Sequence, residues 1–436
     1  MIRRLIAALT LSVTAVTAQA QTQINIQEVT SPSGIEAWLV EENSIPFAAI
    51  EFVFDGGAVL DAPDKRGATN LMMGLIEEGA GDLTAREFQE RREALAASFS
   101  FDTFDDSVTV SAVFLSENRD EAIALLREAL INPRFDQDAV DRVRSQVLAG
   151  IRSDANNPNR IASAALDAAA FGDHPYATPI NGTEETVTAL TRDDILEAHR
   201  NALTTGRVHV GAAGDLSAEE LGEIIDALIG DLPETGPELP EDVAFGLDGG
   251  ITVVPYATPQ SVALFGHSGI ERDDEDFFAA FILNEILGGN GVESRLYREV
   301  REKRGLTYGV STFLVPKDFT EIYLGSVASS NDRIADAIEV IRDEWAALAS
   351  EGITQEELDA AKTYLTGAYP LRFDGNAEIA GILVGMQSVD LTPEYVANRN
   401  DFIEAVTLDD VNRVAAELLD PDGLHFVVVG EPEGLQ

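Results

Sequence analysis

The feature that most constrains this chain is an internal repeat at an offset of 216 residues, from 191 to 407. The run Thr-Arg-Asp-Asp-Ile at 191–195 returns as Thr-Leu-Asp-Asp-Val at 407–411, and His209 corresponds to His425 at the same offset. In both copies an acidic helix start leads through an amphipathic helix to a short strand that ends in glycine. Self-similarity of this kind predicts two homologous halves built on one plan.

A second pair of segments supports the repeat, and a proline-rich stretch marks its boundary. Residues 135–141 return as 353–359, and each opens a long helix with an Asp or Thr cap and acidic residues in the first turn. Residues 232–240 are rich in proline and acid without an apolar period, which is typical of a stiff, exposed linker. The predicted division is a signal peptide at 1–20, an N-terminal half at 21–231, a linker at 232–248 and a C-terminal half at 249–436.

The order of the expected elements favours an α+β fold. Residues 99–114 carry alternating apolar side chains and predict a hairpin that turns near Asp105 and Asp106, and residues 306–314 and 321–328 predict another strand pair. The strands come in adjacent pairs rather than alternating with single helices. Each half is therefore predicted to be a largely antiparallel sheet packed with helices, and not a doubly wound sheet.

Charge and cysteine content exclude several classes of function. The chain has 30 Lys and Arg against 76 Asp and Glu, a net charge of −46, which excludes nucleic acid as a partner because phosphate binding needs a basic surface. Apolar residues make up 45% of the chain, so it is expected to fold despite this acidity. Cysteine is absent, which removes disulfides, thiolate nucleophiles and cysteine-held metals.

The first twenty residues are typical of an export signal. Arg3 and Arg4 precede a short apolar run at 5–16, and Ala18-Gln19-Ala20 forms a small-residue cleavage site. No cysteine follows that site to carry a lipid, and no later apolar run reaches the length of a membrane span. We expect a periplasmic protein without a membrane anchor.

One stretch of the second half carries specific chemistry. A Gly-rich turn at 288–291 leads into a predicted helix at 294–304, which stops at Gly305. The strand predicted after it would place Leu306 and Tyr308 on one face. Arg301 and Tyr308 are seven residues apart.

This stretch closely resembles the second-half signature of the insulinase/pitrilysin (inverzincin) family of zinc peptidases. The run Gly182–Glu185, preceded by His174-Pro175-Tyr176, and the two tandem halves resemble the family as well. The resemblance implies that this chain forms half of a clamshell chamber. It also implies that Arg301 and Tyr308 hold the substrate backbone beside the scissile bond. An arginine offers a planar fork of donors to carbonyl oxygens, and a tyrosine hydroxyl stabilises a developing oxyanion. The alternative is that Arg301 forms a surface ion pair with a glutamate and Tyr308 is half-buried.

The zinc-binding residues of that family are missing from this chain. The family holds zinc with H-x-x-E-H on a first-half helix, where two histidines bind the ion and the glutamate activates water. Asn70 and Gly74 stand where the histidines should be, and Met73 stands where the glutamate should be. The third ligand of the family is a glutamate further along, but no glutamate lies between 128 and 184, where the nearest substitutes are Asp141 and Asp154. No two of the five histidines are four residues apart, so we expect this chain to bind neither zinc nor another cofactor.

The resemblance implies a division of labour between two chains. In two-subunit members of the family one subunit carries H-x-x-E-H and zinc, and the other carries the Arg/Tyr pair. We therefore expect a non-catalytic, substrate-binding subunit of a heterodimeric periplasmic zinc metallopeptidase, inactive alone, whose partners are a homologous H-x-x-E-H subunit and peptide substrates. The alternative is a pseudo-peptidase that acts as a peptide-binding or assembly scaffold. Residues 98–103 are predicted to form an edge strand that pairs with substrate, the alternative being an ordinary strand inside a sheet.

Overall fold

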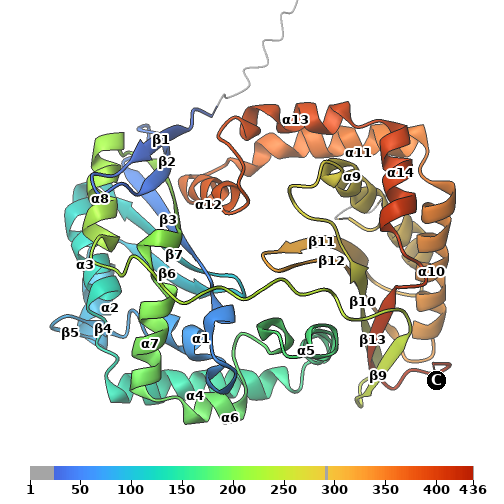
Figure 1. Ribbon diagram of the computed structural model, residues 1–436, viewed down its shortest axis with the longest axis horizontal. Coiled ribbons are helices and arrows are strands. Elements are labelled where there is room, and N and C mark those ends of the chain that lie inside the picture. The colour runs from blue at the N-terminus through green and yellow to red at the C-terminus, as the bar shows by residue number, and fades with distance from the viewer. Residues whose placement is uncertain (1–23, 290–292, 436) are drawn as a thin grey trace, which may run out of the picture.

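The computed structural model describes residues 24–289 and 293–435. It consists of two halves that face each other, with the N-terminal half on the left of Figure 1 and the C-terminal half on the right. The signal peptide predicted at 1–20 lies outside the described residues. Within the described ranges no helix is long and apolar enough to cross a membrane.

The two halves share one series of elements in the same order, to which the N-terminal half adds β1, β4, β5 and α8. The N-terminal half contains β1 (Gln27–Thr30), β2 (Glu36–Glu41), β3 (Phe47–Asp55), α1 (Ala68–Met73), β4 (Gly79–Ala80), β5 (Leu83–Thr84), α2 (Ala85–Ala94), β6 (Ser98–Thr103), β7 (Ser107–Leu115), α3 (Arg119–Ile131), α4 (Gln137–Asp154), α5 (Pro158–Phe171), α6 (Glu184–Ala189), α7 (Arg192–Ala202), β8 (Val208–Gly214) and α8 (Ala218–Ile229). The C-terminal half contains β9 (Ile251–Pro255), β10 (Gln260–Ser268), α9 (Phe277–Leu287), the π-helix η6 (Tyr297–Glu302), β11 (Val310–Lys317), β12 (Thr320–Ser330), α10 (Ile334–Glu351), α11 (Gln355–Ala368), α12 (Asn376–Gln387), α13 (Tyr395–Ala405), α14 (Leu408–Leu418) and β13 (His425–Gly430).

The sheet topology confirms the predicted repeat and the α+β class. The N-terminal sheet has the order β1-β2-β8-β3-β7-β6, and the C-terminal sheet has the order β11-β12-β10-β13-β9. Apart from β1, the two orders are the same when the second is read backwards. All neighbours pair antiparallel except β2 with β8 and β13 with β9, which are the equivalent parallel pair in each half.

Local hydrogen bonds show why the repeated segments form the same structures. Thr191 and Thr407 each cap a helix in a reciprocal capping box with the aspartate three residues later. The side chain of Gln137 donates to Asp141 at the start of α4, and that of Gln355 donates to Asp359 at the start of α11. These polar contacts set the helix starts at equivalent positions, and α7 packs against α1 as α14 packs against α9.

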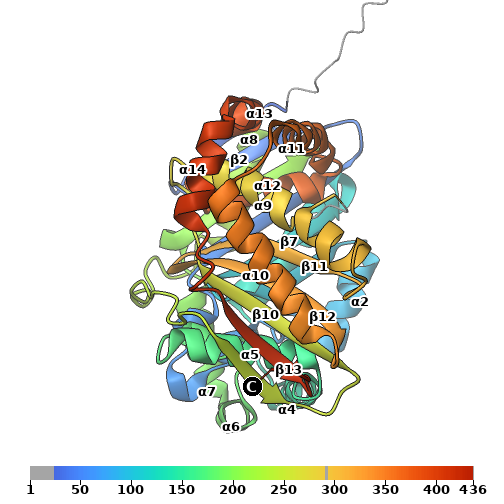
Figure 2. The same cartoon turned by 90° about the vertical axis from the view of Figure 1, so that its right-hand side faces the viewer.

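Each half contributes one helix that packs against the sheet of the other half. Helix α5 packs against β10 and β13, whereas α12 packs against β3 and β8, as Figure 1 shows. Figure 2 shows α10 on the outer face of the C-terminal sheet, so that sheet is covered by its own helix outside and by α5 inside. The exchange buries side chains of both halves together, such as Leu383 against Trp38 and Ala162 against Val262.

A second contact joins the tips of the two equivalent hairpins. Lys317 Nζ, from the β11–β12 turn, lies 2.7 Å from Asp105 Oδ2 of the β6–β7 turn and 3.8 Å from the centroid of the Tyr176 ring. The Tyr176 hydroxyl donates to Asp106 and accepts from the backbone N–H of Phe319 at 3.3 Å. Positions far apart in sequence therefore meet in one polar cluster between the halves.

The linker is part of this seam. Every residue from 230 to 250 is described, and none lies in a helix or a strand. Residues 233–239 are exposed, as predicted, but the later part is held at the seam by two backbone hydrogen bonds. Val243 N–H donates to Phe319 O, and Gly246 N–H donates to Ala170 O. Phe245 is buried against Phe171 of α5.

Several predicted elements need correction. The first-half helix that carries positions 70 and 73 is short, because α1 ends at Met73 and Gly74 caps it. The strand expected from 306 begins only at Val310, and part of the helix expected at 294–304 is a π-helix. The hairpin at 99–114 and its turn at Asp105 and Asp106 are confirmed. The edge position of 98–103 is also confirmed, because β6 ends its sheet and β7 is its one strand neighbour among the described residues.

The helix exchange predicts a strong effect at Gly211 of β8. A Cβ there would lie 2.6 Å from the carbonyl oxygen of Ala380 in α12, which is closer than real contacts allow. Gly211→Ala should therefore push α12 away from the sheet and lower the free energy of unfolding by about 1–3 kcal/mol. Urea unfolding measures this. In Gly150→Ala, the control, the new Cβ meets nothing within 4 Å inside α4, so stability should be unchanged or higher by up to about 1 kcal/mol.

The hairpin-tip cluster predicts a pH dependence. Burial, with Asp106 and Asp55 nearby, raises the pKa of Asp318 to about 7, although His209 and Lys317 oppose the shift. A carboxyl whose pKa is higher in the folded state stabilises the fold when protonated, and this contribution is lost as pH rises through the folded pKa. The midpoint of thermal unfolding should therefore fall between pH 5 and about pH 8. Asp318→Asn should flatten that decline, and Asp332→Asn, at an exposed aspartate of the same half, should leave it unchanged.

Candidate functional site

The positions that hold and activate zinc in the family that this chain resembles carry residues without metal-binding groups here: Asn70 is partly buried, Met73 is buried and Gly74 is exposed. Met73 is 2% exposed and belongs to the core of the N-terminal half. Gly74 is the last residue of the α1 turn, and its N–H donates to Asn70 O at 3.2 Å. A Cβ on Gly74 would contact Val143 of α4 at 3.3 Å. The turn that ends α1 therefore lies next to α4, with no metal-binding side chain at position 73 or 74.

The acidic residues of α4 do not replace the missing ligands. Asp141 is engaged by Gln137 at 2.9 Å and by Arg144 at 3.0 Å, and Asp154 lies 3.9 Å from Arg160. Zinc needs three or four nitrogen, sulfur or oxygen ligands about 2 Å from the ion. No group of three or more His, Asp or Glu side chains in the described ranges is arranged to hold a metal. The residues at these positions do not fit a zinc ion.

Buried polar residues of the segment before α1 hold the backbone around the start of that helix. Asp61 accepts hydrogen bonds from the backbone N–H groups of Gly67 and Thr69, and burial raises its pKa. Arg66, 3% exposed, donates to the carbonyl oxygens of Pro175 and Thr178. The His174-Pro175-Tyr176 run that contributed to the resemblance therefore fixes the start of α1 and the hairpin-tip cluster.

Arg301 lies in the π-helix η6. Lys303 N–H donates to Arg298 O at 3.0 Å, a five-residue spacing that widens the helix by one residue. Such insertions often occur at functional positions. The Arg301 guanidinium lies 4.8 Å from the centroid of the Tyr297 ring, which holds the side chain in place. It forms no ion pair with any described carboxylate, so the alternative of a surface ion pair with glutamate is wrong.

Tyr308 lies in a short loop between η6 and β11. Its side chain is 83% exposed, whereas Leu306 is buried, so the expectation that both lie on one strand face is wrong, and so is the half-buried alternative. Thr307 Oγ1 holds the loop, accepting from Gly309 N–H at 3.0 Å and donating to Ala328 O. An aromatic side chain kept in solvent by an ordered loop has no packing role within this chain.

The backbone that carries both residues is firmly held. Arg295 forms a two-pronged pair with Glu357 of α11 at 2.7 and 2.8 Å. Burial opposes ionisation of Glu357, but this pair and hydrogen bonds from Thr354 lower its pKa to about 2. Arg333 donates to the carbonyl oxygens of Arg304 and Gly305, both at 2.9 Å. Gly305 has φ of +60°, the left-handed conformation that ends the helix.

The structure places Arg301 and Tyr308 on one anchored segment but records no hydrogen bond between them within its described residues. Asn290 to Val292, part of the Gly-rich turn, lie outside those residues. Both side chains carry N–H or O–H donors that form no hydrogen bond with a carboxylate of the described residues. Such a pair is suited to hydrogen-bonding carbonyl oxygens of a second molecule.

Because the residues at positions 70, 73 and 74 do not fit a zinc ion, the isolated protein should not retain zinc. After dialysis, elemental analysis should find far less than one zinc per chain. A chelator should leave the thermal unfolding midpoint unchanged, because a ligand stabilises a fold only by binding it. One tightly held zinc per chain, with a lower midpoint in chelator, would contradict this assignment.

Comparison with known proteins agrees with these observations. Residues 38–184 match the family described as Insulinase (Peptidase family M16), and residues 189–365 match the Peptidase M16 inactive domain. A non-peptidase homolog from Helicobacter pylori is 28% identical over 90% of this chain and 91% of its own length. An uncharacterized zinc protease from Bacillus subtilis is 25% identical over 91% of this chain and 96% of its own length.

A solved structure shares the whole architecture. The peptidase M16 inactive domain from Pseudomonas fluorescens superposes with a TM-score of 0.88 at 28% identity, covering 95% of this chain and 99% of that one. Family matches over both halves, a shared fold and the altered residues at 70, 73 and 74 lead to one conclusion. The chain belongs to the insulinase family of peptidases, as an inactive member.

Proposed function

We propose that this protein is the non-catalytic, substrate-binding subunit of a heterodimeric periplasmic zinc metallopeptidase that degrades peptides. A homologous subunit with H-x-x-E-H supplies the zinc, and this chain supplies Arg301 and Tyr308 in trans. The observation that carries the proposal is the contrast between two sites. The zinc positions carry no residue suited to a metal, with Met73 buried in the core, whereas Tyr308 is 83% exposed on an ordered loop.

The chemistry of the pair suits a peptide next to a metal in another chain. As water attacks the scissile carbonyl, negative charge develops on its oxygen, and donors placed there stabilise the transition state more than the substrate. The Arg301 fork suits substrate carbonyl oxygens and the Tyr308 hydroxyl suits the oxyanion.

The sheet edges support peptide binding of the same kind. β6 and β11 end their sheets, and neither has a second strand neighbour among the described residues. Phe313 on β11 is 47% exposed. An extended peptide could add to either edge by backbone hydrogen bonds, with side-chain contacts adding selectivity. Localisation to the periplasm rests on the signal-like residues at 1–20.

A second candidate is a pseudo-peptidase that binds peptides or organises an assembly without an enzymatic partner. The observation that favours it is the Helicobacter pylori relative, described as a non-peptidase homolog. The two functions differ in whether activity appears when an H-x-x-E-H homologue is added.

Mixing this protein with such a homologue from the same genome should create peptidase activity on unstructured peptides. Tyr308→Phe should lower kcat by roughly 10²–10³-fold, because one oxyanion donor is lost. Arg301→Lys keeps the charge but loses the fork, so it should also lower kcat. Peptide turnover measured at saturating partner tests both.

Matched controls separate chemistry from assembly. Tyr364→Phe changes another exposed tyrosine, and Arg200→Lys changes an exposed arginine of α7. Both should retain full turnover, and all four variants should co-purify with the partner. If the Tyr308 and Arg301 variants pair normally and keep full turnover, the in-trans mechanism is wrong. If no H-x-x-E-H homologue creates activity, the scaffold function replaces it.

A further inference from the structure

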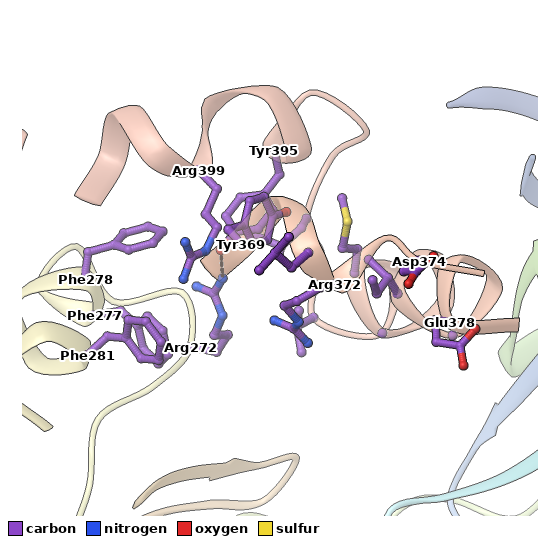
Figure 3. Close-up of a pocket in the computed structure, with 17 residues that line it drawn as sticks. Arg272, Phe277, Phe278, Phe281, Tyr369, Arg372, Asp374, Glu378, Tyr395 and Arg399 are labelled. Carbon is purple, nitrogen blue, oxygen red and sulfur yellow. Dashed lines mark hydrogen bonds between the residues drawn. The ribbon is translucent and has the colours of Figure 1, made fainter. Parts of the chain in front are cut away.

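A pocket of about 800 Å³ lies in the C-terminal half, apart from Arg301 and Tyr308. Its walls come from α9, α12, α13 and the short 3₁₀ helix η7 (Tyr369–Arg372), with Arg272 entering from the loop before α9. Figure 3 shows these side chains converging from segments that are far apart in sequence. The proposed clamp uses none of them.

The basic end of the pocket combines guanidinium groups with aromatic rings. The Arg272 guanidinium lies 4.3 Å from the Phe277 ring centroid, and that of Arg399 lies 4.4 Å from the Tyr369 ring centroid. Arg272 also donates to the Tyr395 hydroxyl at 3.1 Å. A guanidinium resting near a ring keeps its N–H donors in its own plane, where they can meet an acceptor.

No carboxylate of the described chain neutralises these arginines. Arg272, Arg372 and Arg399 take part in no ion pair within those residues, although the protein carries a net charge of −46. Arg399 is only 7% exposed, and its hydrogen bonds go to Leu365 O and the Asn400 side chain, which are neutral. A buried cation without a counter-charge is costly, so an anion that enters the pocket relieves that cost.

The opposite end limits what the ligand can be. Asp374 and Glu378 line the pocket beyond Arg372 and lie at the far end of Figure 3 from Arg272 and Arg399. They would repel a second negative group, which argues against polyphosphates and nucleotides. Phe277, Phe278 and Phe281 provide apolar surface next to the arginines.

We propose that this pocket binds an apolar monocarboxylate, with the carboxylate on Arg272 and Arg399 and the apolar group on the phenylalanine wall. The C-terminal residue of a peptide and a free fatty acid both carry this chemistry. The peptide source rests on the proposed function, in which it would hold the end of a substrate or product away from the clamp.

Calorimetric titration of the purified protein tests the site with three probes. They are a short unstructured peptide ending in leucine, the same peptide with an amidated C-terminus, and decanoate. At least one acid should bind. If it is the peptide acid, it should bind about tenfold or more tightly than the amide, because the charge-assisted hydrogen bonds are lost in the amide.

Variants locate the binding. Arg272→Gln should weaken the acid that binds and abolish any preference for acid over amide. Arg372→Gln removes a second positive charge from the pocket wall and should weaken the acid to a smaller extent. Arg200→Gln, the same change at an exposed arginine of α7, should leave both unchanged. The thermal unfolding midpoint shows whether each variant is folded. If Arg272→Gln does not fold, Arg372→Gln still tests the pocket, because Arg372 is exposed.

The outcomes separate this site from the proposed function. Decanoate binding that depends on the arginines, without binding of either peptide, supports the site and removes the peptide source. Equal binding of acid and amide, unaffected by the arginine variants, overturns the site but leaves peptide binding by the chain intact. Failure of both acids to bind also overturns the site.

Discussion

The exchange of helices between the halves is the contact on which the rest of the structure depends. Each half has a hydrophobic core of its own, and further apolar clusters form between the halves where α5 covers the C-terminal sheet and α12 covers the N-terminal sheet. The polar cluster at the hairpin tips and the buried Phe245 of the linker close the same seam. Burial of apolar area is the main source of stability, so two halves that bury apolar surface against each other should behave as one cooperative unit. A rigid frame is what holds η6 and the loop with Tyr308 in fixed positions.

The two regions that correspond to the zinc site and the Arg/Tyr pair of the family differ in how their side chains are placed. On α1, Met73 is buried in the core of the N-terminal half and Gly74 has no side chain, so neither position offers a metal ligand. Beside β11, hydrogen bonds of Arg295, Arg333 and Thr307 hold the backbone of the segment that carries Arg301. The side chain of Tyr308 remains exposed to solvent. Order in the backbone together with exposure of the side chain is the signature of a binding position rather than of a core residue.

The sequence predicted those features that depend on local chemistry. Capping residues such as Thr191 and Thr407, the alternation through 99–114 and the spacing of the two halves are all local patterns, and the structure bears them out. The helix exchange was missed because the apolar face of α12 is the same whichever sheet it covers. The alternation of Leu306 and Tyr308 was misleading because the hydrogen bonds of Thr307 turn the chain before β11 begins. The arginine pocket was also missed, since Arg272, Arg372 and Arg399 are brought together by tertiary folding alone.

We propose that peptide cleavage takes place between two chains, with zinc in one and the Arg301 and Tyr308 clamp in the other. The most direct measurement is a crystal structure of the complex with an uncleavable peptide, with anomalous diffraction recorded at the zinc edge. The account predicts one zinc peak per heterodimer, held by the H-x-x-E-H subunit, with the hydroxyl of Tyr308 and the guanidinium of Arg301 on the peptide backbone next to it. A zinc peak beside Gly74 of this chain, or a peptide bound with Tyr308 still in solvent, would contradict it.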